Sequence, residues 1–483
     1  MHQIGSHGEA PLKVPEAASL VDVPELCDLS AEQLVNAYRD AILSPVAVTL
    51  AALDRAAAVN TALNAFTLID HDGALSAAKA SEARWRAGNP AGPLDGVPTT
   101  IKDIVTTEGW PSRLGSRTTD ASPQPLDAPS VQLLRRAGAV LIGQTTTPEF
   151  GWKAVTDGPL FGKTRNPWNP DLTPGGSSGG AAVAAATGAG VLHLGSDGGG
   201  SIRIPASFTG IVGHKPTFGR VPAFPPSAFG TVSHIGPMAR RVEDAIAMLD
   251  ILSGRDLRDW HQSPVAFKPA RMEAQPSLNG RRIGLWTTPP AGRVSPQVAA
   301  QVQKAAATIE LLGARVEAVE LPLGGLLDLF HTLWFAGAAT RLRTLTATQR
   351  SGMDPGLLEI AEIGSHISAA DYVAASVRRA EFGAAMERLF ESFDLLISPA
   401  TAITAFAIGM EVPPGSNLKR WTEWAGFSFP LNLSQQPACS IPCGFSADNL
   451  PIGLQIIGPR GADQRVLAAA AVCERAFKGQ LHI

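Results

Sequence analysis

Apolar positions along the chain switch between the spacing of a strand and the spacing of a helix. In the C-terminal half, short apolar runs of strand length alternate with longer segments of helical pattern. This alternation predicts an α/β fold with a central sheet covered by α-helices on both faces. The expected strands there are 282–286, 315–319 and 394–398, and the expected helices are about 296–312, 323–350 and 369–391.

The N-terminal half shows the same alternation, with clearer signals for where helices begin. Ser30 followed by Gln33 forms a capping box for a helix to about residue 42, and Ser44-Pro45 begins a second helix to about residue 59. The other expected elements are strands at 64–69, 97–102, 139–143 and 191–194, and helices at 74–86 and 130–136.

Two clusters of glycine and serine lie between residues 171 and 207. The first, 175–180, opens an alanine-rich helical segment, and the second, 198–201, follows the apolar strand 191–194. Glycines allow consecutive backbone N–H groups to converge on one point, which suits an anion or a developing oxyanion. Ser201 comes directly after three glycines and is therefore a candidate nucleophile.

These clusters have two other interpretations. Glycine and serine are common linker residues, and Ser177 or Ser178 could be the N-cap of the helix, but linkers do not alternate with packed elements. A phosphate-binding loop needs a Lys-Ser or Lys-Thr pair that closes a Gly-x-x-x-x-Gly frame. Neither cluster has such a pair.

The two clusters and a strand upstream resemble the signature of the amidase signature family of serine hydrolases, which uses a Ser-Ser-Lys triad. Position by position, Ser201 matches the nucleophile, and Ser177, 24 residues before it, matches the bridging serine. The segment 96–103 fits the pattern Gly-x-Pro-x-x-x-Lys-Asp and places Lys102 as the base. A lone lysine would normally be a solvated surface residue, but this one ends an apolar strand.

The resemblance also implies roles around the triad. In relatives the segment 145–152 lines the acyl pocket, where Gly151 would leave space and Trp152 would offer a flat wall for a bulky or aromatic group. The equally weighted alternative is that Phe150 and Trp152 are core residues. The assigned residues are Gly198, Gly199 and Gly200 for the oxyanion hole, with the Ser201 N–H; Asp197 and Arg203 for the shape of the loop; and Phe150, Gly151, Trp152, Gly176 and Ser178 for substrate binding.

The expected chemistry depends on protonation. No histidine occupies a recognisable triad position, so a lysine has to activate the serine. Because desolvation lowers the pKa of a lysine, Lys102 can act as a base near neutral pH only if it is buried. We expect Lys102 to be buried and neutral, and Ser177 to relay a proton from Ser201 to Lys102 and later to the leaving amine.

The resemblance covers about residues 28–477 and implies one large domain with a mixed central sheet. The N-terminal residues 1–24 are expected to be a flexible arm, because they lack both the basic and the apolar segment of a secretory signal. The domain is expected to span 25–483, with a helical layer at 25–90, a surface excursion at 255–280 and a variable entrance loop at 401–429. The proline-rich loop 221–226 is a candidate pocket rim.

Composition narrows the class of protein further. The net charge of −3 gives no indication of nucleic acid or an anionic membrane as a partner, and no stretch supplies about 20 strongly apolar residues. Four scattered cysteines indicate a reducing cytoplasm, and neither they nor the histidines form a metal-binding pattern. We expect no metal and no cofactor; relatives are often dimers, so a homodimer is one possible assembly.

Three functions remain open at this point. The resemblance favours an amidohydrolase that cleaves a small carboxylic amide through an acyl-enzyme, with aryl amides, esters and carbamates within the reach of the same triad. The second candidate is the A subunit of a glutamyl-tRNA amidotransferase, which usually has an Asn-Met-Asp-Glu-Phe type of segment where this chain has Thr-Thr-Pro-Glu-Phe at 146–150. The third is a non-catalytic binding protein, which the intact triad disfavours. The sequence leaves the substrate and its enantiomer undetermined.

Overall fold

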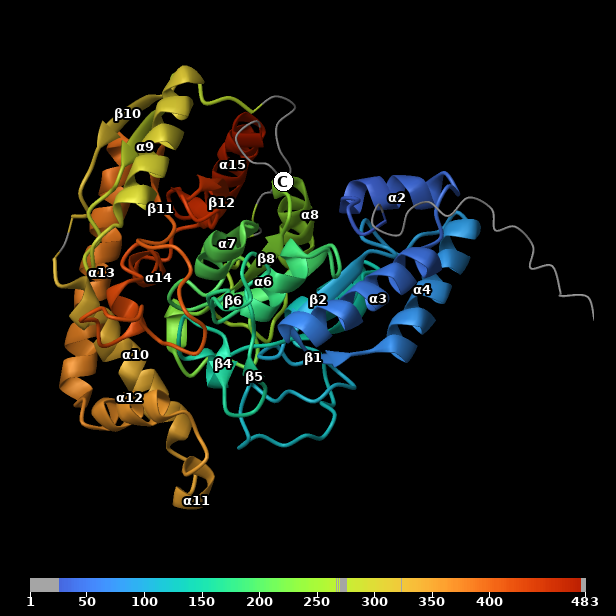
Figure 1. Cartoon of the computed structure of the whole chain (residues 1–483), viewed down its shortest axis with the longest axis horizontal. Helices are drawn as coiled ribbons and strands as arrows, with labels where there is room; N and C mark the ends of the chain where they lie inside the picture. Colours follow the sequence, from blue (N-terminus) through green and yellow to red (C-terminus); the bar gives the residue numbers. More distant parts are fainter. Residues whose placement is uncertain (1–25, 266, 268, 270–275, 323, 479–483) are drawn as a thin grey trace, which may run out of the picture.

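A computed structural model describes residues 26–265, 267, 269, 276–322 and 324–478, and a mixed sheet forms its centre (Figure 1). Within these residues the sheet has eleven strands in the order β1-β3-β2-β6-β8-β7-β12-β13-β11-β9-β10. Their bounds are β1 Phe66–Ile69, β2 Pro98–Lys102, β3 Val140–Thr145, β6 Leu192–Asp197, β7 Val212–Lys215, β8 His234–Ala239, β9 Arg282–Leu285, β10 Arg315–Ala318, β11 Leu395–Pro399, β12 Ala438–Phe445 and β13 Pro451–Ile457. A separate hairpin joins β4 Asp157–Gly158 and β5 Gly162–Lys163.

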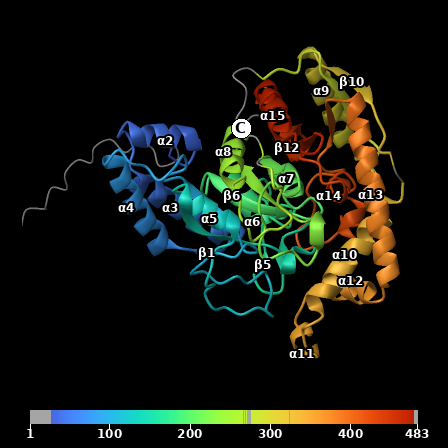
Figure 2. The same ribbon diagram turned by 180° about the vertical axis from the view of Figure 1, so that it is seen from behind.

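Helices cover both faces of this sheet, as the two opposite views show (Figures 1 and 2). Along β11, Leu395 and Ile397 belong to one core cluster, whereas Leu396 between them belongs to another. Because successive side chains of a strand point to opposite faces, the two clusters lie on opposite sides of the sheet. The helices are α2 Ala31–Arg39, α3 Pro45–Leu63, α4 His71–Arg86, α5 Pro129–Arg136, α6 Gly179–Ala186, α7 Arg203–Thr209, α8 Val242–Leu252, α9 Pro296–Leu311, α10 Leu326–Leu342, α11 Ala347–Arg350, α12 Pro355–Ser365, α13 Ala369–Ser392, α14 Pro430–Leu433 and α15 Asp463–Phe477.

Three parallel strands bring charged residues to one edge of the sheet. β2 pairs in parallel with β6, and β7 runs in the same direction because both β6 and β7 pair antiparallel with β8. The last residues of these strands, Lys102, Asp197 and Lys215, therefore lie at the same edge. In open α/β sheets this carboxyl edge is where ligands bind.

The fold class expected from the sequence is confirmed: the domain has a large mixed sheet flanked by helices. The capping box at Ser30 and Gln33 is present and begins α2. The helix expected at 323–350 is instead two helices, α10 and α11. The break occurs because Thr346 caps a new helix, accepting the Gln349 N–H while the Gln349 side chain accepts the Thr346 N–H.

The N-terminal part consists of α2, α3 and α4 around β1, and the arm expected at 1–24 lies outside the described residues. Among the described helices, α3 is long and apolar enough to cross a membrane by length and composition alone, although it is only weakly apolar, with a mean hydropathy of 1.3. Its residues Leu53 and Ala56 are completely buried, and the helix packs against α4, β1 and β3. This is the packing of a core helix.

Candidate active site

Lys102 ends β2 and is completely buried among serine hydroxyls. Its Nζ lies 2.6 Å from the Ser177 Oγ, 2.9 Å from the Ser178 Oγ and 3.0 Å from the Ser196 Oγ. Burial lowers the pKa of Lys102 from 10.5 to about 7, although the nearby negative charge of Asp197 opposes this shift. A substantial fraction of the amine is therefore neutral near pH 7.

Ser177 is held in place by a loop that only glycine can form. The peptide bond between Gly176 and Ser177 is cis. A Cβ atom on Gly176 would lie 2.6 Å from the carbonyl carbon of Val155, so a larger residue does not fit there. Directly after Ser177, α6 begins with Gly179 and Gly180, and a Cβ on Gly180 would lie 2.4 Å from the Thr146 N. Close backbone approach at each glycine fixes the position of the Ser177 hydroxyl.

Ser201 follows β6 and is only 7% exposed, but it lines the main cavity together with Ser177. The backbone connects the two glycine-serine clusters, because the Ser178 N–H donates to the Ser201 carbonyl at 3.1 Å. The described part of the chain offers the Ser201 hydroxyl no hydrogen-bond partner within reach. This hydroxyl is thus free to approach a molecule in the cavity.

The loop between Asp197 and Arg203 is shaped by a buried ion pair. Arg203 donates from Nε and Nη2 to the two carboxylate oxygens of Asp197, at 3.0 Å and 2.9 Å. Arg203 also donates to the Ser428 carbonyl, Gln455 and Asn432. The charge of Arg203 and its hydrogen bonds to Asp197 hold the pKa of Asp197 below its usual range despite burial. Two charges with all their partners satisfied make a rigid support for the loop.

This support changes the expected set of oxyanion donors. The Gly200 N–H donates to the Asp197 carboxylate at 2.8 Å, so it is not available to a substrate oxygen. In contrast, the Gly199 carbonyl accepts the Ser428 hydroxyl at 2.8 Å and is held on the far side of the loop. Among the described residues, the N–H groups of Gly198, Gly199 and Ser201 have no protein acceptor. These three are the donors the loop leaves open.

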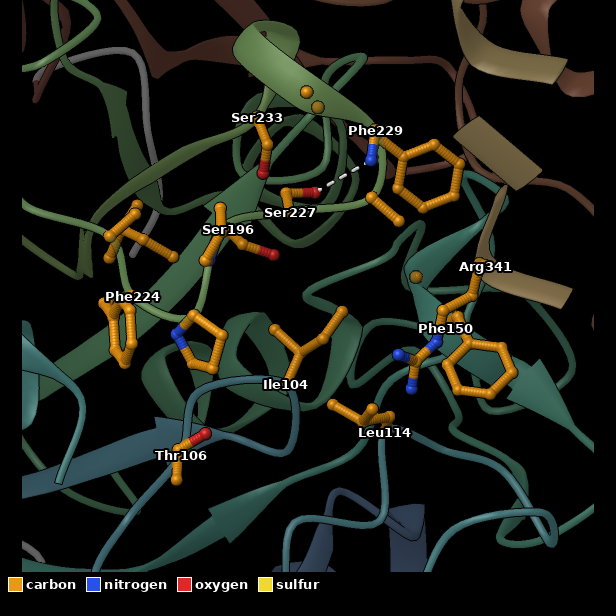
Figure 3. A pocket seen from close by; sticks show the side chains of 18 of the residues that line it. Ile104, Thr106, Leu114, Phe150, Ser196, Phe224, Ser227, Phe229, Ser233 and Arg341 are labelled. Carbon is orange, nitrogen blue, oxygen red and sulfur yellow. Dashed lines mark hydrogen bonds between the residues drawn. The ribbon is translucent and has the colours of Figure 1, made fainter. Parts of the chain in front are cut away.

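The main cavity has a volume of about 630 Å³ and includes Ser201 in its lining. Figure 3 shows other side chains of this lining, among them Ser196, Phe150 and Arg341. Its wall is largely aromatic and apolar, with the rings of Phe229 and Trp334 stacked 3.9 Å apart. Further apolar members of the lining are Ile104, Leu114, Phe150, Phe218, Phe224, Pro225, Pro226, Ile235 and Trp260. A largely apolar pocket with a few polar groups is typical of a small-molecule site.

The expected substrate-binding residues divide into two groups. Phe150 and Gly151 line the cavity, and both have a positive φ, of 53° and 68°. Trp152, Gly176 and Ser178 are not part of the lining. Trp152 is buried in the core, and its carbonyl accepts the indole N–H of Trp334, which supplies the flat wall instead. Trp152 is therefore a core residue, which was the alternative interpretation of the sequence.

The proline-rich loop expected at the rim, 221–226, contributes residues 223–226 to the cavity lining. Loop 223–230 lies on the rim, and residues 258–261 line the cavity beside it, so part of the excursion at 255–280 belongs to the site. The segment 401–429, all of it described, contributes no residue to the lining of this cavity, and its assignment as an entrance loop stays a prediction. Its large aromatic side chains are buried, and Trp421 packs against the loop between Asp197 and Arg203, where a Cβ on Gly199 would meet it at 2.7 Å.

Sequence reasoning missed several residues that the fold brings to this site. Ser196, Trp334, Phe229 and Arg341 line the cavity but lie outside the clusters that carry the resemblance. Ser196 could have been found, since a strand places residue 196 on the same face as 194 and 198. The other three lie far away in the sequence, and only the packing of α10 against loop 223–230 brings them together.

Comparisons with known proteins identify the family of this chain. The family model described as "Amidase" matches residues 47–467. The glutamyl-tRNA(Gln) amidotransferase of Symbiobacterium thermophilum has an A subunit that is 35% identical, over 93% of this chain and 97% of that protein. An acylamidase of Rhodococcus erythropolis is 33% identical, over 92% of this chain and 94% of that protein.

Solved structures indicate the same family. A bacterial aryl acylamidase of the amidase signature family superposes with a TM-score of 0.85 at 32% identity, over 93% of this chain and 96% of the other. The chain therefore belongs to the amidase signature family, as the sequence predicted, and its fold is that of an amide-hydrolysing enzyme family.

Proposed function

We propose that this protein is an amidohydrolase in which Ser201 is the nucleophile, Ser177 the proton relay and Lys102 the base. The observation that carries the proposal is the buried Lys102 amine, with a pKa near 7, lying 2.6 Å from a serine hydroxyl that shares the cavity with Ser201. A serine hydroxyl becomes a good nucleophile only when a neighbouring base takes its proton.

The hydrogen bonds around Lys102 suit a neutral amine. The Ser178 hydroxyl donates to the Ser196 carbonyl at 3.1 Å, so its oxygen accepts from Lys102. The Ser196 oxygen accepts a second N–H. The charged amine has three N–H donors for the three hydroxyl oxygens, whereas the neutral amine has two N–H donors and one lone pair, which can accept the Ser177 O–H. This arrangement supports Ser177 as the group whose proton Lys102 takes.

The proposed reaction has two stages, acylation of Ser201 and hydrolysis of the resulting ester. The Ser201 oxygen attacks the carbonyl carbon while its proton passes to Ser177, whose own proton passes to Lys102. The N–H groups of Gly198, Gly199 and Ser201 stabilise the oxyanion. The C–N bond breaks, the amine leaves with a proton returned through Ser177, and an ester to Ser201 remains. Water, deprotonated by the same route, releases the acid.

The cavity supports a substrate with an aromatic or bulky apolar group. Phe150, Phe229 and Trp334 line it, and such rings prefer flat apolar partners. Esters and carbamates present a carbonyl to the same groups and belong to the proposed range. Relatives that belong to glutamyl-tRNA(Gln) amidotransferases make glutaminase activity within a complex the second candidate.

The test uses the purified single chain without ATP or partner proteins. We expect it to release 4-nitroaniline from an aryl-acyl 4-nitroanilide, and we expect Ser201→Ala to abolish this activity while remaining folded by circular dichroism. Glutaminase activity that appears only with co-expressed partner proteins would support the second candidate. Unchanged activity in Ser201→Ala would contradict the proposed nucleophile.

A further inference from the structure

The cavity wall carries a positive charge that forms no ion pair within the described part of the chain. Arg341, in the last turn of α10, points into the cavity over the ring of Phe150 (Figure 3), with its guanidinium carbon 4.3 Å from the ring centroid. Among the described residues, Arg341 has neither an ion pair nor a hydrogen-bond acceptor within reach. An arginine remains charged at neutral pH, so this charge faces the cavity uncompensated.

The carboxylates near Arg341 are engaged elsewhere. Glu149, next to Phe150, accepts the Ser116 hydroxyl at 2.6 Å and the Asp354 N–H at 2.7 Å. Asp354 forms an ion pair with Lys153 at 2.8 Å. These contacts leave no acidic partner aimed at the guanidinium.

The other charged residues of the lining are also satisfied. Asp259 accepts the N–H groups of Ala223 and His261, both at 2.9 Å. Arg258 forms an ion pair with Asp256 at 2.7 Å. Of the charged groups that the described residues place on the lining, Arg341 is thus the one with neither an ion pair nor a hydrogen bond. Burial lowers its pKa, which means that the half-buried charge is disfavoured while the cavity is empty.

The position of Arg341 sets how far its charge lies from the reacting carbonyl. Trp334 and Arg341 both line the cavity and are seven residues, or two turns, apart on α10, which is about 10 Å along the helix axis. At the other end of this span, Trp334 packs against the nucleophile loop, where a Cβ on Gly198 would lie 2.9 Å from its ring. Ser201 and Arg341 therefore line the same cavity from separate elements, so one bound substrate can contact both.

We propose that Arg341 is a specificity-determining residue that binds a carboxylate carried by the substrate, away from the amide that is cleaved. A guanidinium presents a planar fork of N–H donors that matches the two oxygens of a carboxylate. One unpaired arginine neutralises one charge, which favours a monoanion. This inference rests on the proposed amidohydrolase function and narrows its substrate to an apolar or aromatic amide with an acidic group.

The test compares matched substrates that differ only in charge. The 4-nitroanilides of linear dicarboxylic acids are paired with their neutral terminal carboxamides, and a second pair carries the carboxylate or carboxamide on the amine part. In one of these two pairs, we expect the wild-type kcat/KM to be about 10- to 100-fold higher for the acid than for its carboxamide. The difference should come mainly from a lower KM for the acid. We expect Arg341→Met to remove this preference and to change kcat/KM for the carboxamide less than about 3-fold, with Arg341→Lys intermediate.

Arg343→Met is the matched control, because Arg343 is an exposed arginine at the end of the same helix. We expect it to leave both substrates unchanged. Equal loss of activity toward acid and carboxamide in Arg341→Met would overturn the inference and show that Arg341 only supports Phe150. A wild-type protein without preference for the acid in either position would also overturn it.

A binding measurement separates this inference from the proposed function. In a Ser201→Ala background, calorimetric titration with the preferred acid needs no turnover, and we expect Arg341→Met to weaken its Kd about 10- to 100-fold but to leave the carboxamide unaffected. Charge-selective binding without amide cleavage in the wild type would overturn the hydrolase assignment alone. Cleavage without charge selectivity would overturn the role of Arg341 alone.

Discussion

Lys102 and Lys215 end parallel strands at the same edge of the sheet, and both are completely buried. Burial lowers the pKa of each. Their surroundings differ, because Lys102 faces three serine hydroxyls, whereas Lys215 donates to the carbonyls of Gln436 and Pro216 and lies 3.4 Å from His234. Carbonyls only accept hydrogen bonds, whereas a hydroxyl can accept and donate a proton.

The comparison shows that burial alone does not make a lysine a catalytic base. A shifted pKa supplies a neutral amine, but the proton also needs a path to the reacting atom. Lys102 has this path, since Ser177 lines the cavity beside Ser201. Lys215 lacks it, because neither Lys215 nor the neighbouring His234 belongs to the lining of that cavity. We therefore propose a catalytic role for Lys102 and an electrostatic role for Lys215 beside Asp197.

The largest expected effect separates the two lysines directly. Lys102→Met should lower kcat about 10⁴-fold, because the general base is lost. At pH 6 the melting temperature of Lys102→Met should be no lower than that of the native protein. Below the folded pKa of about 7 the native chain holds a protonated amine in a buried site, and this cost is relieved as the pH rises from 7 toward 10.5.

Lys215→Met is the counterpart of this experiment. It should retain kcat within about 10-fold, but lose about 1–3 kcal/mol of unfolding free energy, since the Gln436 carbonyl loses its buried donor. Steady-state kinetics and urea denaturation measure the two effects. If Lys215→Met were as inactive as Lys102→Met while still folded, the distinction between the lysines would fail.

A smaller effect should distinguish two of the serine hydroxyls around Lys102, those of Ser177 and Ser178. Ser177→Ala should lower kcat about 10³-fold, because the relay is removed, whereas Ser178→Ala should lower it about 10-fold or less. Both serines lie within 3 Å of the Lys102 amine, but only Ser177 lines the cavity. Burst kinetics with a chromogenic amide measure the acylation rate in each variant. Equal losses would show that both serines merely hold Lys102.

The sequence was sufficient for the residues that occur in short local motifs. Lys102, Ser177 and Ser201 each lie beside glycines or at a strand end, where backbone geometry dictates the residue type. The capping box at Ser30 was equally local. Such features depend on neighbours within a few positions, but the roles of Ser177 and Lys102 were taken from the resemblance of these motifs to a family signature.

The parts that the sequence could not give depend on contacts between distant segments. The Gly200 N–H is a plausible oxyanion donor until the fold turns the Asp197 carboxylate onto it. Trp152 and Trp334 are equally apolar in sequence, and only the packing of α10 decides which one lines the cavity. Arg341 was missed because a basic residue in the last turn of a helix is ordinary and needs no functional explanation.

The most direct test of the central claim is the pH dependence of Ser201 labelling by phenylmethanesulfonyl fluoride, followed by mass spectrometry. Labelling needs the neutral form of Lys102 but no knowledge of the substrate. Because this form accumulates above the pKa, the rate should rise with pH through a midpoint of about 7 and then level off. The same profile should be absent in Lys102→Met. A midpoint above 9, or an unchanged profile in Lys102→Met, would contradict the account.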